Sequence, residues 1–226
     1  MFIYVRHAFS KANQYHFTVQ KYGKENIDDH MDHPYFTRDA QLTDIGHEQS
    51  AASGKAFKAW LDDQDDDVVI DKVVISPMMR TIETASAFLR EVGYQGEVTL
   101  DPILREIMDV NIADMGTEKT PLLERIRNSS NLLTGLTINE SELTKEVWFS
   151  ETPESKAGFN ARIEAIRDKY VRPTENDPKK ITLVFSHHVV GRGLRGTEEP
   201  INNTQIERIK ADGSSQTLYK PAPAPI

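Results

Sequence analysis

The chain has 226 residues, contains no cysteine and carries a formal net charge of -8 at pH 7. This length suits a single α/β domain with a sizeable core. The lack of cysteine excludes disulfides, thiolate metal sites and a thiol nucleophile, and the acidic balance argues against a general nucleic-acid or anionic-membrane binder. No apolar run approaches the ~20 residues of a membrane span, and the first residues are too short an apolar run for a signal peptide. We therefore expect a cytoplasmic protein with neither nucleic-acid nor membrane partners.

An apolar run begins almost at the first residue and ends in a cation and an imidazole. Residues 2–5 predict a short buried strand, and Arg6 and His7 follow at its carboxyl end, where open α/β sheets build their sites. Ser10 and Asn13 lie in a polar stretch that can begin a helix, whose free backbone N–H groups favour an anion at the same place. Alone, an Arg–His pair is more often structural than functional, so its meaning depends on whether the pattern recurs.

A second buried strand is predicted at residues 73–75. Ser76 suits the N-cap of a following helix, and Pro77 suits its first position because the missing N–H would be unpaired there. Apolar residues then recur at helical spacing as far as Leu89. Arg80 falls in the first turn, the end of a helix that attracts anions.

A third buried strand is predicted at residues 181–186, and it leads directly into two histidines. Parallel strands that end at one edge of a sheet bring the residues that follow them together. Two guanidinium groups match phosphate oxygens in geometry as well as in charge. The sequence therefore predicts a cationic cup made by Arg6, His7, Arg80 and His187.

With these residues in place, the sequence resembles the histidine phosphatase superfamily, also called the phosphoglycerate mutase-like family. The matching motifs run in order as far as about residue 194: Arg6-His7-x-x-Ser10-x-x-Asn13, Leu42-Thr43-x-x-Gly46-x-x-Gln49, Ser76-Pro77-x-x-Arg80-Thr81-x-Glu83-Thr84-Ala85, Leu104-x-Glu106 and Ser186-His187. The resemblance implies an α/β three-layer sandwich whose mostly parallel central sheet is flanked by helices. We expect one domain over residues 1–220, with insertions near 14–41 and 107–150, and a Pro-rich tail over 221–226.

The activity that this resemblance implies is a phosphomonoesterase that needs no metal and no cofactor and acts on a small-molecule phosphomonoester. His7 would attack phosphorus and carry the phosphoryl group as a phosphohistidine. Glu106 would be the general acid and then the general base; burial can raise its pKa, although nearby arginines oppose that shift. Asp109 and Asp114 are the alternatives for this role. The predicted contacts to the phosphate or the substrate are Arg6, Ser10, Asn13, Arg80, His187 and His188.

Four positions depart from the family pattern. Ala8 stands where glycine is usual, Phe9 where a polar residue is usual, Glu83 where glutamine is usual, and His188 where glycine usually follows the second catalytic histidine. The side chains at 8 and 188 can narrow the pocket or tilt His187, and Phe9 would make the mouth of the pocket more apolar.

Two alternatives stay open beside the phosphomonoesterase. A phosphoglycerate mutase-type phosphoryl transfer would use the same nucleophile, but the family's mutases commonly carry tryptophan where this chain has Ala12, which favours hydrolysis. A weakly active member that binds a phosphorylated ligand or a protein partner is the other alternative. The sequence identifies neither the physiological substrate nor the oligomeric state.

The insertions are the least readable segments. Residues 28–33 contain aspartate and histidine ligands for a metal, but a solvated loop is the better interpretation. We expect residues 14–41 to form a loop that walls the substrate cleft, with Lys11 and Arg38 adding charge at its rim. Residues 107–150 show no clear element, and in the family this segment is the lid over the substrate.

Regular elements are clearer elsewhere in the chain. Their predicted positions are a helix capped by Thr43 that runs past Trp60, a strand at 97–100, a helix over 159–170, and a hairpin made of strands at 202–209 and 216–220.

Overall fold

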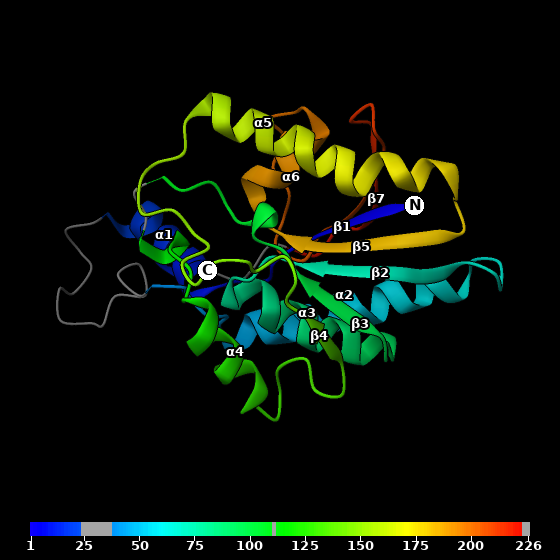
Figure 1. The fold of residues 1–226 in the computed structure, drawn as a ribbon, viewed down its shortest axis with the longest axis horizontal. Helices are drawn as coiled ribbons and strands as arrows, with labels where there is room; N and C mark the ends of the chain where they lie inside the picture. Colours follow the sequence, from blue (N-terminus) through cyan, green and yellow to red (C-terminus); the bar gives the residue numbers. More distant parts are fainter. Residues whose placement is uncertain (24–37, 110–111, 223–226) are drawn as a thin grey trace.

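The computed structural model describes residues 1–23, 38–109 and 112–222. These residues form a seven-stranded sheet between two layers of helices (Figure 1). The strands lie in the order β4-β3-β2-β5-β1-β6-β7. The five strands from β4 to β1 are parallel to their neighbours, and β6 and β7 add an antiparallel hairpin at one edge. Their bounds are β1 Phe2–Arg6, β2 Val69–Ile75, β3 Glu97–Leu100, β4 Thr137–Asn139, β5 Lys180–Ser186, β6 Ile206–Ile209 and β7 Ser215–Tyr219.

Helices cover both faces of this sheet. In Figure 1, α2, α3 and α4 lie below the sheet and α5 and α6 above it. The bounds are α1 Lys11–Tyr22, α2 Asp44–Asp62, α3 Met79–Val92, α4 Lys119–Arg127, α5 Lys156–Ile166 and α6 His188–Arg195. A π-helical turn at Arg167–Val171 and a 3₁₀ turn at Arg172–Asn176 continue α5. In the part of the chain described, no helix combines the length and apolar character needed to cross a bilayer.

The core consists of two apolar clusters, one on each face of the sheet. β1 contributes to both, because successive side chains of a strand point to opposite faces. Ile3 and Val5 pack into the cluster beneath α2 and α3, whereas Phe2 and Tyr4 pack into the cluster beneath α5 and α6. All four side chains are almost fully buried, which explains why this strand reads as a continuous apolar run.

The register of the three central strands brings the expected residues to one edge. Arg6 of β1 lies beside Ser186 of β5, and Ile75 of β2 lies beside Phe185. The three strands therefore end at the same level, and the residues that follow them face a common space. This geometry confirms the convergence that the three strand-end motifs predict.

The predicted N-cap of α3 is wrong. α3 begins at Met79, not at Pro77. The backbone N–H of Met79 donates to Oδ1 of Asp39 at 2.7 Å. The hydroxyl of Ser76 instead forms a hydrogen bond with Nε2 of His187 at 2.8 Å. A distant carboxylate thus caps the helix, and the local serine is free to hold the histidine.

Three other elements differ from expectation. α1 extends from Lys11 to Tyr22, so the first part of the 14–41 segment is helical, with Ser10 as its N-cap. The segment 107–150 contains α4 and the edge strand β4, because apolar side chains of α4 pack into the main core. The strand predicted at 202–209 begins only at Ile206. The candidate metal ligands at 28–33 lie outside the described residues.

Asp39 yields a test of this architecture. Its carboxylate is almost fully buried and accepts hydrogen bonds from Met79 and, through Oδ2, from the backbone N–H and hydroxyl of Thr117 at 3.2 and 2.7 Å. Asp39→Ala leaves these donors unpaired, so we expect the free energy of unfolding to fall by about 3 kcal/mol in urea denaturation. Asp62→Ala, which removes only an exposed ion pair with Lys58, should cost less than about 1 kcal/mol. Equal losses in the two variants would contradict the capping role of Asp39.

Candidate active site

A cavity of about 310 Å³ opens at the carboxyl edge of β1, β5 and β2. It has a size typical of small-molecule sites. Most of the side chains predicted from the motifs line it: Arg6, His7, Ser10, Asn13, Arg80, Glu106 and His188. Lys11, Arg38 and Phe9 are not among the described residues that line it; Arg38 instead donates to the carbonyl of Gly116 at 2.8 Å.

His7 is held in one orientation with one nitrogen left for chemistry. Its backbone N–H continues the pairing with β5 by donating to the carbonyl of Ser186 at 2.9 Å. Its Nδ1 lies 2.8 Å from the carbonyl of Ala8, so Nδ1 carries the proton and Nε2 carries the lone pair. Burial, followed by the charges of Arg80 and Arg6, holds the pKa of His7 well below its ordinary value. The imidazole is therefore neutral at pH 7.

Arg80 is the most fully engaged cation of the site. Its Nη2 forms an ion pair with Oδ1 of Asp114 at 2.6 Å, and its Nη1 donates to the carbonyl of Ala113 at 2.9 Å. Its Nε donates to Nδ1 of His187 at 3.3 Å. The Arg80 side chain is only 4% exposed, and a buried guanidinium needs such partners.

Arg6 is less fully paired. Its Nη1 donates to the carbonyl of Ile201 at 2.6 Å, whereas its Nε is buried and lacks a hydrogen-bond partner among the described residues. Burial lowers the pKa of Arg6 to about 10, so the guanidinium stays charged at neutral pH. Together with Arg80 it gives this edge of an acidic protein a locally positive field.

His187 lies behind Arg80, with both ring nitrogens bonded. Nδ1 accepts from Arg80, so Nε2 carries the proton and donates to the hydroxyl of Ser76. The His187 ring centroid lies 5.3 Å from that of His7, and burial, with Arg80, lowers the pKa of His187 well below its ordinary value. In this arrangement His187 orients Arg80. Direct contact of His187 with a substrate oxygen stays a prediction.

Asn13 has its carbonyl oxygen fully occupied. Oδ1 accepts from the backbone N–H and hydroxyl of Ser10 at 3.2 and 3.1 Å and from Nδ2 of Asn203 at 3.1 Å. The amide NH₂ of Asn13 is therefore the group left to donate into the cavity. Ser10 acts here as the cap of α1, and Asn203 also donates to the carbonyl of His7 at 2.9 Å. The motifs gave no signal for Asn203.

Glu106 lines the same cavity as Arg6 and Arg80. Its two oxygens accept from the backbone N–H groups of Ile107 at 2.9 Å and Val189 at 3.1 Å. Burial, followed by the nearby carboxylate of Asp114, raises the pKa of Glu106, whereas these two hydrogen bonds and Arg80 oppose the rise. Burial dominates, so Glu106 retains its proton to a higher pH than an ordinary glutamate.

Residues far along the chain hold the loops that carry these groups. The hydroxyl of Thr84 accepts from the backbone N–H of Ala8 at 2.9 Å, and the hydroxyl of Ser186 donates to the carbonyl of Leu104 at 2.7 Å. Arg162 of α5 donates to the carbonyls of Ile103 and Arg105 at 3.0 and 2.8 Å. The sequence marks Arg162 only as one polar residue of a helix, so its role was not predictable.

Side chains at the positions that depart from the family pattern find room in this arrangement. Phe9 is buried beside Phe17, with ring centroids 5.8 Å apart, and its carbonyl approaches Gly46 so closely that a Cβ there would lie 2.2 Å away. The His188 imidazole turns to the carbonyl of Ile201, at 3.2 Å from Nδ1. Burial and Arg6 lower the pKa of His188 to about 4. Because Phe9 is buried and does not line the cavity, it does not form the apolar mouth that the sequence predicts.

Within the described residues, no group of three or more histidine, cysteine, aspartate or glutamate side chains is arranged to hold a metal ion. What the cavity combines is a neutral imidazole with a free lone pair, two guanidinium groups, an amide donor and a carboxyl group whose pKa is raised. This set suits a dianionic ligand that is attacked at its centre and loses an oxygen leaving group. The fold and site together suit an α/β protein that binds a phosphate group at the carboxyl edge of its sheet.

Comparison with known proteins identifies the family. The model of the histidine phosphatase superfamily (branch 1) matches residues 30–221, so the chain belongs to that superfamily. No curated protein matches the chain by sequence. Among solved structures, ecdysone phosphate phosphatase from Bombix mori is 16% identical, with a TM-score of 0.53. The alignment covers 100% of this chain and 94% of the phosphatase. A phosphoglycerate mutase from Bacillus anthracis is 17% identical, with a TM-score of 0.54 and coverages of 96% and 90%. At these identities, the two structures establish the phosphoglycerate mutase-like fold alone.

The ion pair of Arg80 predicts how the site responds to an anion. A bound phosphate competes with Asp114 for the charge of this guanidinium, because the Asp114 carboxylate already pairs with Nη2 at 2.6 Å and three of the five N–H groups of Arg80 donate to other described residues. We expect Asp114→Asn to bind inorganic phosphate about tenfold more tightly, measured by calorimetry. Asp109→Asn removes the same charge from the cavity lining without touching Arg80, and should give less than about a threefold change. Equal effects of the two substitutions, or weaker binding in Asp114→Asn, would contradict the competition.

Proposed function

We propose that this protein is a metal-independent phosphomonoesterase that works through a phosphohistidine on His7, with Glu106 as general acid and then general base. The observation that carries the proposal is the state of His7. Its Nδ1–H is bound to the carbonyl of Ala8, its Nε2 makes no hydrogen bond to any described residue, and it lines a cavity flanked by Arg6 and Arg80.

In the first step, the Nε2 lone pair of His7 forms a bond to phosphorus while the bond from phosphorus to the ester oxygen breaks. The proton of Glu106 moves to that oxygen, so that the product leaves as a neutral alcohol. Arg6, Arg80 and the amide of Asn13 bind the non-bridging oxygens, over which the negative charge is spread in the transition state. The phosphate takes the place of Asp114 at Arg80.

In the second step, Glu106 acts as a carboxylate. It accepts a proton from water as the water oxygen attacks phosphorus and the bond from phosphorus to Nε2 of His7 breaks. Inorganic phosphate leaves, and Glu106 is again protonated. The raised pKa of Glu106 supports both halves of this cycle, because the group has to exchange a proton near neutral pH.

A small-molecule substrate fits this cavity best. The volume of about 310 Å³ holds a phosphate and a modest leaving group. The lining beyond the phosphate is mixed, with Ile107 and Val189 beside Asp109 and His16. The overall charge of -8 works against a polyanionic nucleic acid as substrate.

Removal of the nucleophile is the direct test. Phosphate release from aryl, sugar, nucleotide, phosphoglycerate and phosphopeptide esters would be measured in chelator. We expect His7→Ala to lower the rate on every ester that wild type hydrolyses by at least about 10³-fold, because the covalent step is lost. Melting curves of both proteins control for unfolding. Release that persists in folded His7→Ala would overturn the proposal. Isomerisation of phosphoglycerates without release would indicate the mutase instead, and absence of both reactions would indicate a binding protein.

The role of Glu106 has its own signature. We expect Glu106→Gln to slow alkyl phosphates by about 10²-fold or more and activated aryl phosphates much less, because only poor leaving groups need a proton. For alkyl phosphates, wild-type kcat/KM should fall as pH rises through the raised pKa of Glu106, since the acid is then lost. This fall should be absent in Glu106→Gln. The substrate phosphate also titrates, with a second pKa of about 6. This titration is common to both proteins, so it cancels when kcat/KM of wild type is divided by kcat/KM of Glu106→Gln at each pH. Equal losses on both ester classes would remove Glu106 from the mechanism.

A further inference from the structure

The loop that carries Glu106 has little regular structure of its own. A short 3₁₀ turn at Pro102–Leu104 precedes it, and residues 105–109 form neither helix nor strand. Backbone carbonyls outside regular elements need donors from elsewhere in the chain. The position of Glu106 therefore depends on the groups that donate hydrogen bonds to the carbonyls around it.

Hydrogen bonds from α5 and from the segment just before it hold this loop. Nη1 of Arg162 donates to the carbonyls of Ile103 at 3.0 Å and Arg105 at 2.8 Å. The backbone N–H of Glu154 donates to the carbonyl of Met108 at 3.0 Å. The loop is thus bonded on both sides of its glutamate to one short stretch of the chain.

Arg162 and Glu154 are also bonded to each other. Nε of Arg162 donates to Oε1 of Glu154 at 2.8 Å and Nη2 donates to Oε2 at 2.5 Å. The two side chains are only 7% and 10% exposed. Burial works to raise the pKa of Glu154, but the hydrogen bonds and charge of Arg162, together with Arg105, lower it below its ordinary value. A carboxylate that stays charged on one edge of a planar guanidinium fixes the direction of the remaining N–H groups.

We propose that the Arg162–Glu154 pair positions Glu106 for proton transfer to the leaving group, an inference that rests on the function proposed above. Glu106 accepts from the backbone N–H of Ile107 in the same loop, so a movement of the loop moves the carboxyl group as well. A misplacement of ~1 Å can cost about 10²-fold in rate. Arg162 is not among the described residues that line the active-site cavity. It acts through Glu106, so only reactions that need the proton of Glu106 depend on it.

The ratio of kcat/KM for alkyl and activated aryl phosphates tests the proposal. This quantity reports the first step, whereas the second step needs Glu106 for every ester. We expect Arg162→Gln to lower kcat/KM at least about tenfold for alkyl phosphates and less than about threefold for aryl phosphates. In the Glu106→Gln background the same substitution should change the alkyl value less than about twofold, because the acid is already absent. Arg162→Lys keeps the charge beside Glu154 but lacks the planar fork, so it should show the same selectivity with an alkyl loss of about threefold or more.

Arg167→Gln is the matched control. Arg167 lies on the continuation of α5 and also donates to two backbone carbonyls, those of Gly193 and Leu194, both at 2.9 Å. This variant should keep the alkyl-to-aryl ratio within about twofold of wild type, and melting curves would confirm that each variant folds.

Three results would each overturn the positioning role: equal losses on both ester classes in the folded Arg162 variants, the same selectivity in Arg167→Gln, or an undiminished alkyl loss in the Glu106→Gln background. A Glu106→Gln variant without selectivity would instead refute the general acid itself, and the positioning role with it. Selectivity in Glu106→Gln that is missing from the Arg162 variants would refute the positioning role alone.

Discussion

Burial of two guanidinium groups beside two imidazoles is the constraint on which this site depends. Arg6 and Arg80 reach the carboxyl edge of the sheet, where burial and positive charge together keep His7 and His187 neutral. A neutral His7 retains its lone pair, which a nucleophile requires. The same buried charge has to be balanced when no anion is bound, and Asp114 does this for Arg80. The neutral state of the nucleophile His7 and the ion pair between Asp114 and Arg80 are therefore two consequences of the same buried positive charge.

The geometry of the site is fixed mainly by groups that do not face the cavity. Asn203 holds both the backbone of His7 and the side chain of Asn13. Thr84 holds the backbone that follows His7, and Arg162 holds the loop that precedes Glu106. These contacts join segments from both ends of the chain. They are the kind of support that keeps reacting groups in place and lowers the cost of reorganisation.

The sequence predicts the parts of the site whose signals are local. An apolar run followed within a few residues by an arginine or a histidine marks a buried strand and its edge, and three such runs predict that Arg6, His7, Arg80 and His187 lie together. The sequence cannot specify which polar groups form hydrogen bonds or ion pairs with each other when they lie far apart along the chain. Ser76 carries the local signal of an N-cap, yet its hydroxyl binds His187, and the remote Asp39 caps the helix. The pairing of Arg80 with Asp114 and the packing of α4 likewise depend on tertiary contacts.

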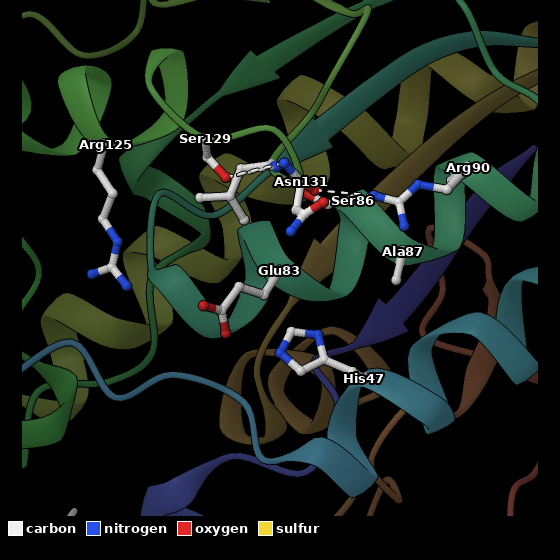
Figure 2. A pocket seen from close by; sticks show the side chains of 9 residues that line it. His47, Glu83, Ser86, Ala87, Arg90, Arg125, Ser129 and Asn131 are labelled. Atoms are coloured by element: carbon white, nitrogen blue, oxygen red, sulfur yellow. Dashed lines mark hydrogen bonds between the residues drawn. The ribbon is translucent and has the colours of Figure 1, made fainter.

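α3 contributes Arg80 to the active-site cavity and Glu83, Ser86 and Arg90 to a second cavity of about 520 Å³ (Figure 2). Arg80 and Thr84 face the β1 edge, whereas Glu83, one residue before Thr84, faces the second cavity, because successive residues of a helix point about 100° apart. Glu83 also accepts the backbone N–H of Leu42, and Leu42 bridges to Ser10, the cap of α1. The carboxylate exposed to the second cavity is thus bonded to the backbone that supports the first. Any group that changes the charge or position of Glu83 therefore acts on its hydrogen bond with Leu42. Leu42 contacts Ser10, and Ser10 donates to Asn13 of the first cavity.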